Sequence, residues 1–212
     1  MRVRELPILF NIEMVKAILN GRKTCTRRAI ELPDKMTGRP IGKSGDSSNP
    51  LGFFYPGGIK RPPYQPGDIL YVRETWSEIK NADGSHKKYV YKASDQYPFG
   101  ESRYIIKFNW KPSIHMPKEA ARIWLKVTDV RVERLQDITE DGAKEEGANF
   151  KNGKNVGLEE KMRRTAIERF AEIWNSTIKK TNIDRYGWDA NPWVWVIEFE
   201  RCKSRERSSN GY

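Results

Sequence analysis

The chain has 212 residues, and its 39 Lys and Arg against 28 Asp and Glu give a formal net charge of +11. That length allows one large domain or a small domain with elaborations. The charge favours a polyanionic partner, above all nucleic acid.

Cysteine and histidine are scarce, with Cys25 and Cys202 near opposite ends and His86 and His115 isolated from each other. Neither the spacing of a metal site nor a disulfide framework is present, so we expect no metal, no cofactor and two reduced thiols in a cytoplasmic protein. Nothing in the sequence has the pattern of a signal peptide, and no apolar run is long enough to span a bilayer, so we expect no membrane partner.

The first predicted element is an amphipathic helix from Asn11 to Leu19, with Asn11 as its N-cap. Gly21 suits the left-handed residue that ends such a helix, and the β-branched residues after it predict a strand. Thr26 and Arg28 share one face of that strand, and Lys23 lies in the turn before it. This group could bind an anion or activate a hydroxyl nucleophile, whereas the structural alternative is a solvated turn.

Residues 29–66 are rich in Pro, Gly and Ser and show no clear periodicity, which predicts an irregular insertion. It contains both basic and aromatic side chains, a mixture that suits contact with nucleic acid. The alternative is a solvated insertion with no such role.

The residues from Ile69 to Trp76 predict a strand on which Glu74 shares a face with apolar side chains. A carboxylate in that setting needs a cationic partner, and Lys23 or Arg28 could supply it. The alternative places Glu74 at a solvated strand end.

The remaining pattern predicts a mixed fold of strands and helices. The expected strands are Tyr89–Lys92, Tyr104–Phe108, Arg122–Glu133 and Trp193–Phe199, and the expected helices run from Thr139 to Gly147 and from Leu158 to Trp174. We find no domain boundary, and therefore predict one α+β domain over 1–200, with a helical elaboration at 148–190 and a basic tail at 201–212.

Four segments of the chain resemble the ASCH family of the PUA-like superfamily. They are Ile18–Arg28, Pro66–Val72, Ile138–Gly147 and Trp195–Phe199. Two further segments, Arg73–Trp76 and Pro112–Pro117, are similar to the larger phage and prophage ASCH proteins. The resemblance implies a small mixed β-barrel with flanking helices and a cleft that takes RNA or a nucleobase.

Some small ASCH proteins are amidohydrolases that remove the acetyl group of N4-acetylcytidine with a lysine, a threonine and a glutamate. The resemblance places Lys23, Thr26 and Glu146 at those three positions. Thr26 would be the nucleophile or orient a water, Lys23 would activate it, and Glu146 would exchange a proton. Cys25 and Arg27 depart from the apolar residues common in the motif, and the chain is about twice the length of those enzymes.

We expect the substrate-binding residues to converge with the catalytic set on one cleft. Arg28 would stabilise an oxyanion, Glu74 and Trp76 would recognise the base, and Ser113 and His115 belong to the segment shared with phage proteins. The alternative for His115 is a surface or structural histidine.

Two other functions remain open from the sequence. In an RNA-binding or single-stranded nucleic-acid-binding module, Lys23 and Arg28 would contact phosphate while Trp76 or Trp110 stacks on a base. In a metal-independent ribonuclease, Lys23 and His115 would act as acid and base.

Overall fold

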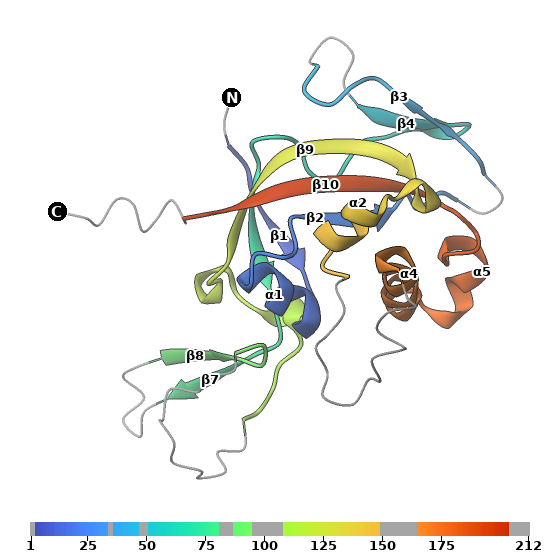
Figure 1. Cartoon of the computed structure of the whole chain (residues 1–212). Helices are drawn as coiled ribbons and strands as arrows, with labels where there is room; N and C mark the ends of the chain where they lie inside the picture. Colours follow the sequence, from blue (N-terminus) through green and yellow to red (C-terminus); the bar gives the residue numbers. More distant parts are fainter. Residues whose placement is uncertain are drawn as a thin grey trace. The chain divides into compact units, whose positions relative to one another are not determined.

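The computed structural model describes residues 3–33, 36–46, 51–80, 87–94, 108–148 and 165–203 (Figure 1). The chain separates into two compact units, which we describe one at a time. The first unit comprises Met1–Gly21, Asp68–Lys126 and Arg201–Tyr212, and the second comprises Arg22–Gly67 and Val127–Glu200. Strands and helices occur together, so the predicted α+β class is confirmed.

A five-stranded mixed sheet has the order β1-β6-β9-β10-β2. Its strands are β1 (Glu5–Leu9), β6 (Ile69–Arg73), β9 (Trp124–Arg134), β10 (Trp193–Cys202) and β2 (Cys25–Ala29). The first unit holds the parallel pair β1 and β6 and the start of β9, whereas the second holds the rest of β9 and the antiparallel pair β10 and β2. Within the described residues the sheet ends at β1 and β2 and does not close into a barrel.

The first helix, α1 (Ile12–Leu19), begins and ends as the sequence predicts. The Asn11 side chain accepts a hydrogen bond from the Met14 backbone N–H at 2.9 Å, which satisfies one of the unpaired donors of the first turn. Gly21 adopts a φ of +70°, the left-handed conformation that costs glycine least.

The strand predicted from Ile69 to Trp76 is broken in the structure. β6 ends at Arg73, and β7 (Trp76–Lys80) forms a separate antiparallel hairpin with β8 (Lys87–Tyr91). Glu74 lies in the break, where its backbone N–H donates to the Met116 sulfur at 3.2 Å. The alternation in the sequence therefore predicts one strand where the structure has two, and the two belong to different sheets.

Several predicted boundaries shift or fall on other parts of the chain. The strand expected at Tyr89–Lys92 is β8, that expected at Arg122–Glu133 is β9, and the last predicted strand is β10. Of the strand predicted at Tyr104–Phe108, only Phe108 is described. The helix expected at Leu158–Trp174 is seen as α4 (Ala166–Thr177), and residues 149–164 lie outside the described ranges, as does the tail beyond 203.

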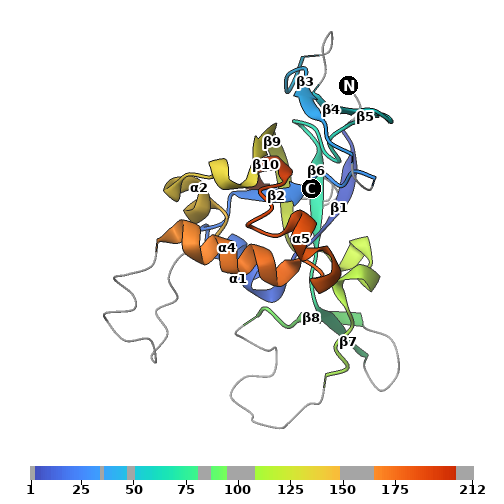
Figure 2. The ribbon, with the colours of Figure 1, turned by 90° about the vertical axis from the view of Figure 1, so that its right-hand side faces the viewer.

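Residues 29–66 are not irregular throughout, which corrects the expectation. β3 (Arg39–Ile41), β4 (Gly52–Tyr55) and β5 (Gly58–Lys60) form a small antiparallel sheet (Figure 2). Strands of three or four residues are too short to show a period in the sequence. Phe53 is fully buried, and its ring centre lies 5.7 Å from that of Trp193.

In the described part of the second unit, α2 (Glu140–Glu145) and α4 are capped by side chains. A shorter helix, α5 (Ile183–Tyr186), and single 3₁₀ turns at Leu135–Asp137 and Lys180–Asn182 lie there too. Thr139 caps α2, and Thr165 with Glu168 forms a capping box at the start of α4. None of the helices in the described ranges is both long and apolar enough to cross a membrane.

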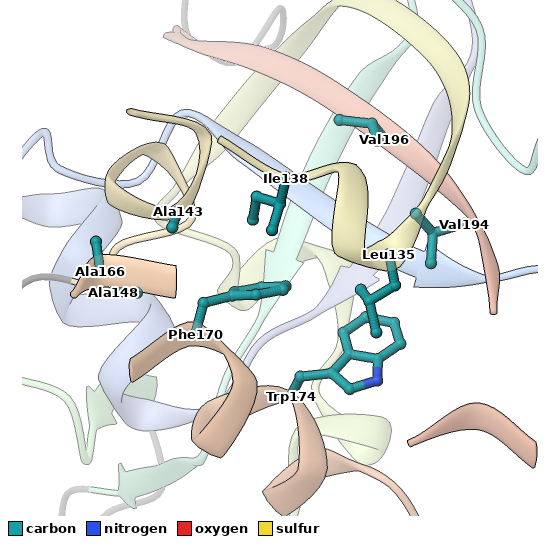
Figure 3. Close-up of a cluster of buried hydrophobic side chains, with 9 residues drawn as sticks. All are labelled: Leu135, Ile138, Ala143, Ala148, Ala166, Phe170, Trp174, Val194 and Val196. Carbon is teal, nitrogen blue, oxygen red and sulfur yellow. The ribbon is translucent and has the colours of Figure 1, made fainter. Parts of the chain in front are cut away.

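The core of the second unit lies between these helices and the β10 side of the sheet (Figure 3). Phe170 and Trp174 project from α4 toward Leu135 and toward Val194 of β10. This packing joins the segment after β9, α2 and α4 to β10, so α2 and α4 are held against one face of the sheet.

Replacing Leu135 by Ala tests this core. Leu135 is fully buried among aromatic and β-branched side chains, so the change leaves a cavity and lowers the free energy of unfolding by about 2–5 kcal/mol in urea denaturation. Ile59→Ala, at a side chain that is 47% exposed, serves as the control and changes it by less than about 0.5 kcal/mol. Equal effects of the two changes would contradict the packing.

Candidate functional site

The turn that carries Lys23 is fixed to the end of α2 by backbone pairing. Lys23 and Glu146 form an isolated antiparallel bridge, and the Thr24 N–H donates to the Glu145 carbonyl at 2.8 Å. Gly147, at a φ of +87°, then turns the chain away from the helix. Two segments far apart in the sequence are thereby held in register.

The side chains of Lys23 and Glu146 form a buried ion pair across this bridge. Lys23 Nζ lies 2.5 Å from Glu146 Oε2 and 3.0 Å from the Glu146 carbonyl oxygen. The Lys23 side chain is 0% exposed and that of Glu146 is 5% exposed. The solvated turn that we considered as the alternative is therefore wrong for Lys23.

Arg27 is a second cation on the same carboxylate, and the sequence analysis noted it only as a departure from the family motif. Its Nη1 lies 3.4 Å from Glu146 Oε1, and its Nη2 lies 3.3 Å from Glu133 Oε2. Its guanidinium carbon is 5.8 Å from the centre of the Phe170 ring. Its Nε is buried without a hydrogen-bond partner among the described residues. The alternation of β2 was the available signal, because it puts Cys25 and Arg27 together on one face.

The charges continue alternately from Arg27 along β9 and β10. Glu133 Oε1 lies 2.5 Å from Arg131 Nε, and Arg131 also forms an ion pair with Glu198. Burial alone would lower the pKa of Arg131, but its hydrogen bonds to Glu133 and Glu198 raise that pKa above the usual value. Each cation in this row therefore contacts a carboxylate, and the row grows more exposed toward Glu198.

Thr26 and Arg28 lie on the opposite face of β2 from Arg27, by the alternation of the strand. Thr26 is buried and Arg28 is half-buried. Burial lowers the pKa of Arg28, and attraction to Tyr64 and Glu146 offsets part of that shift. An arginine stays protonated near neutral pH even so. Of the predicted catalytic three, the structure joins Lys23 to Glu146 and places Thr26 three residues further along the chain from Lys23.

Cys25 is the other side chain on the Arg27 face, and it is buried. Burial, and secondarily the Glu146 charge, raises the pKa of this thiol to about 12. Its sulfur lies 4.0 Å from the Gly142 carbonyl oxygen and 3.8 Å from Arg27 Nη1. A thiol with that pKa carries almost no thiolate near neutral pH.

In the first unit, Glu74 forms its own buried ion pair, with Arg122. The two oxygens of Glu74 lie 2.8 and 2.9 Å from Nε and Nη2 of Arg122, a bidentate arrangement. Arg122 also donates to Ser94 at 2.8 Å and lies 4.2 Å from the centre of the Tyr91 ring. Burial raises the pKa of Glu74, and the Arg122 hydrogen bond offsets part of that shift.

This pairing corrects two expectations about Glu74. Its side chain is 1% exposed, so it does not lie at a solvated strand end. Its partner is Arg122, where the sequence analysis named Lys23 or Arg28. Arg122 lies 48 residues along the chain, and no local pattern connects the two positions.

The Trp76 side chain is packed against other side chains of its unit. It is 4% exposed, the Lys111 ammonium lies 4.7 Å from its ring centre, and the Tyr89 ring meets it edge-on at 5.7 Å. Ser113 and His115 form a 3₁₀ turn in the same unit, with His115 exposed. The predicted convergence of these residues with the catalytic set would span two units and stays a prediction.

Comparison with protein-family models, curated proteins and solved structures found no match to this chain. Within the described residues, no three His, Cys, Asp or Glu side chains gather as a metal site would require.

The raised pKa of Cys25 predicts a pH-dependent loss of stability. The folded state holds the thiol proton more tightly than the unfolded chain does, so this contribution is intact below the unfolded pKa of about 8.5 and declines above it. Relative to Cys25→Ala, the wild-type chain loses about 2 kcal/mol of unfolding free energy between pH 8 and pH 10. Denaturation series at several pH values measure this. Cys202→Ala, the control, keeps the wild-type slope, and an unchanged slope in Cys25→Ala would contradict the assignment.

Proposed function

We propose that this protein is an amidohydrolase that acts on N4-acylated cytidine or a similar modified pyrimidine, with Lys23 and Glu146 as its proton-transfer pair. The observation that carries the proposal is the 2.5 Å contact between Lys23 Nζ and Glu146 Oε2 in a buried setting. The runner-up is a nucleic-acid-binding module without catalysis.

A buried ion pair adds little net free energy of folding, because the desolvation of both ions offsets most of their Coulombic attraction. Such a pair is common where a proton must move, since a lysine becomes a base only after it gives up its proton. Glu146 offers an oxygen at the distance that such a transfer needs. This supports a chemical role for Lys23.

The same geometry argues against Lys23 as a phosphate ligand. Its side chain is 0% exposed and its ammonium is held by both the carboxylate and the carbonyl of Glu146. A phosphate could reach it only by displacing that carboxylate. A nucleic-acid-binding module would therefore have to contact phosphate through other cations.

In the proposed reaction, Lys23 passes its proton to Glu146 and then accepts a proton from the attacking hydroxyl, which belongs to Thr26 or to a water that Thr26 orients. The oxygen bonds to the acyl carbon, and Arg28, on the Thr26 face of β2, stabilises the negative oxygen that forms. Glu146 then gives its proton to the pyrimidine amine as the C–N bond breaks. The products are the free amine and a carboxylic acid, and an acyl-Thr26 ester would need one water to release that acid.

We propose that the domain that carries this site is an ASCH domain of the PUA-like superfamily, with a sheet that is open over the described residues. The resembling segments coincide with the end of α1 and β2, with β6, with α2 and with β10. They include the helix-end turn and the end of α2 that carry Lys23 and Glu146.

The non-catalytic reading is favoured by the net charge of +11 and by the exposed face of the β3–β5 sheet. On that face Phe54 is exposed, and the Arg39 guanidinium carbon lies 5.8 Å from its ring centre. An arginine beside an exposed aromatic is a combination that single-stranded nucleic acid uses.

Turnover of N4-acetylcytidine, followed by mass spectrometry, tests the proposal. Lys23→Ala and Thr26→Ala abolish turnover, and Lys23→Arg fails as well because arginine does not release its proton. Glu146→Gln lowers kcat more than it raises KM, since it keeps shape and loses proton transfer. Circular dichroism confirms that each variant is folded.

Lys144→Ala is the matched control, because Lys144 lies on α2, the helix that Glu146 caps, but pairs with Asp141 in solvent. It keeps wild-type turnover, and turnover changes little between 50 and 300 mM salt. Full activity in Lys23→Arg would overturn the proton-transfer role of Lys23. No turnover in a panel of N4-acylated nucleosides, alongside steeply salt-dependent RNA binding, would overturn the hydrolase in favour of the binding module.

A further inference from the structure

A cavity of about 170 Å³ lies in the second unit, away from the residues of the Lys23–Glu146 site. Its walls come from the segment after β2, residues 36–38, the end of β9, α5 and the start of β10. Several of these segments belong to parts of the chain that the ASCH resemblance does not cover. Two arginines and two aromatic side chains dominate its lining.

The first wall is a stacked pair, Arg134 and Trp193. The Arg134 guanidinium carbon lies 4.3 Å from the centre of the Trp193 ring. Arg134 Nη1 donates to the Asn191 carbonyl at 3.0 Å, and the Leu135 N–H donates to the Pro192 carbonyl at 3.0 Å. The two residues before Trp193 are thus held in place by hydrogen bonds from Arg134 and Leu135.

The second wall is Arg185 with Tyr186, at the end of α5. Arg185 Nη2 donates to the carbonyls of Leu32 and Pro33, both at 2.5 Å, and its guanidinium carbon lies 5.2 Å from the Tyr186 ring centre. The Tyr186 hydroxyl donates to the Leu32 carbonyl at 3.4 Å. These contacts fix the ring of Tyr186 and add a second positive charge.

Charge and size together restrict what the cavity can hold. Its described lining contains two guanidinium groups and no carboxylate, so its field favours an anion. Its volume is below the range of about 300–1,000 Å³ typical of pockets that enclose a whole small molecule. One flat ring fits, and the rest of the ligand must remain outside.

We propose that this cavity takes one base of a single-stranded nucleic acid, with a neighbouring phosphate on Arg134. Aromatic rings and guanidinium planes are the surfaces on which unpaired bases stack, and charge-assisted bonds hold the phosphates. A strand places a single ring in the cavity and its backbone at the mouth, as the size requires. The site is independent of the proposed hydrolysis, because binding here needs no acylated base.

Fluorescence anisotropy at 50 mM salt tests the site with labelled octauridylate RNA and the matching deoxyuridine octamer, which differs from it only in the sugar. Arg134→Gln keeps a donor for the Asn191 carbonyl but removes the charge, and it weakens binding by about fivefold or more. The control is Arg169→Gln, which removes the same charge from α4 at a residue outside the cavity and changes binding by less than about twofold. Whichever octamer binds identifies the sugar.

A second measurement distinguishes binding in the cavity from general electrostatic attraction to the protein surface. RNA carrying 4-thiouridine is crosslinked by ultraviolet light, and the adduct maps to the peptide containing Trp193 or Tyr186. Equal weakening by the two arginine variants, adducts only on other peptides, absence of octamer binding, or uridine monophosphate binding as tightly as the octamer would each overturn the proposal. None of these readouts uses catalysis, so its failure leaves the hydrolase test unaffected.

Discussion

The ion pair between Lys23 and Glu146 is the contact on which the arrangement of the second unit depends. It lies where the chain enters β2 and where it leaves α2, and the backbone bridge between the same two residues fixes both segments. From there β2 pairs with β10, and α2 packs into the core that α4 completes. Removing Glu146 would take a carboxylate away from the buried ammonium of Lys23, at a cost of about 3–5 kcal/mol.

The carboxylates of this unit are used to neutralise buried cations. Glu146 contacts both Lys23 and Arg27, and Glu133 contacts both Arg27 and Arg131. Carboxylates committed in this way screen the exposed cations less effectively. A net charge of +11 can therefore coexist with a buried group of side chains whose charges are balanced.

The sequence predicts those features of the fold that depend on residues close together in the chain. The Asn11 cap, the Gly21 turn and the Thr139 cap could be predicted because each acts within four residues. The long strands β9 and β10 could be predicted because they are rich in apolar and β-branched residues. The contact between Lys23 and Glu146 agrees with the placement that the family resemblance implied, although it joins residues 123 positions apart.

What the sequence did not reveal depends on distant partners. The break at Glu74 and its pairing with Arg122 follow from burial, which no local window reports. The sequence does not predict a role for Arg27, because the resemblance marks that position only as one that is commonly apolar; in the structure its charge completes the contacts of Glu146. Strands as short as β3 carry too few residues to show a period.

A double-mutant cycle on Lys23 and Glu146 tests this account most directly. Unfolding free energies are measured in urea for Lys23→Met, Glu146→Gln and the double variant. Each single change costs about 3 kcal/mol, and the double change costs less than their sum by about 2 kcal/mol, because each single change loses the same attraction between Lys23 and Glu146 and the double change loses it only once. The solvated pair Lys144 and Asp141, treated in the same way, shows no coupling above error. A coupling of zero between Lys23 and Glu146 would contradict the claim that this buried pair organises the unit.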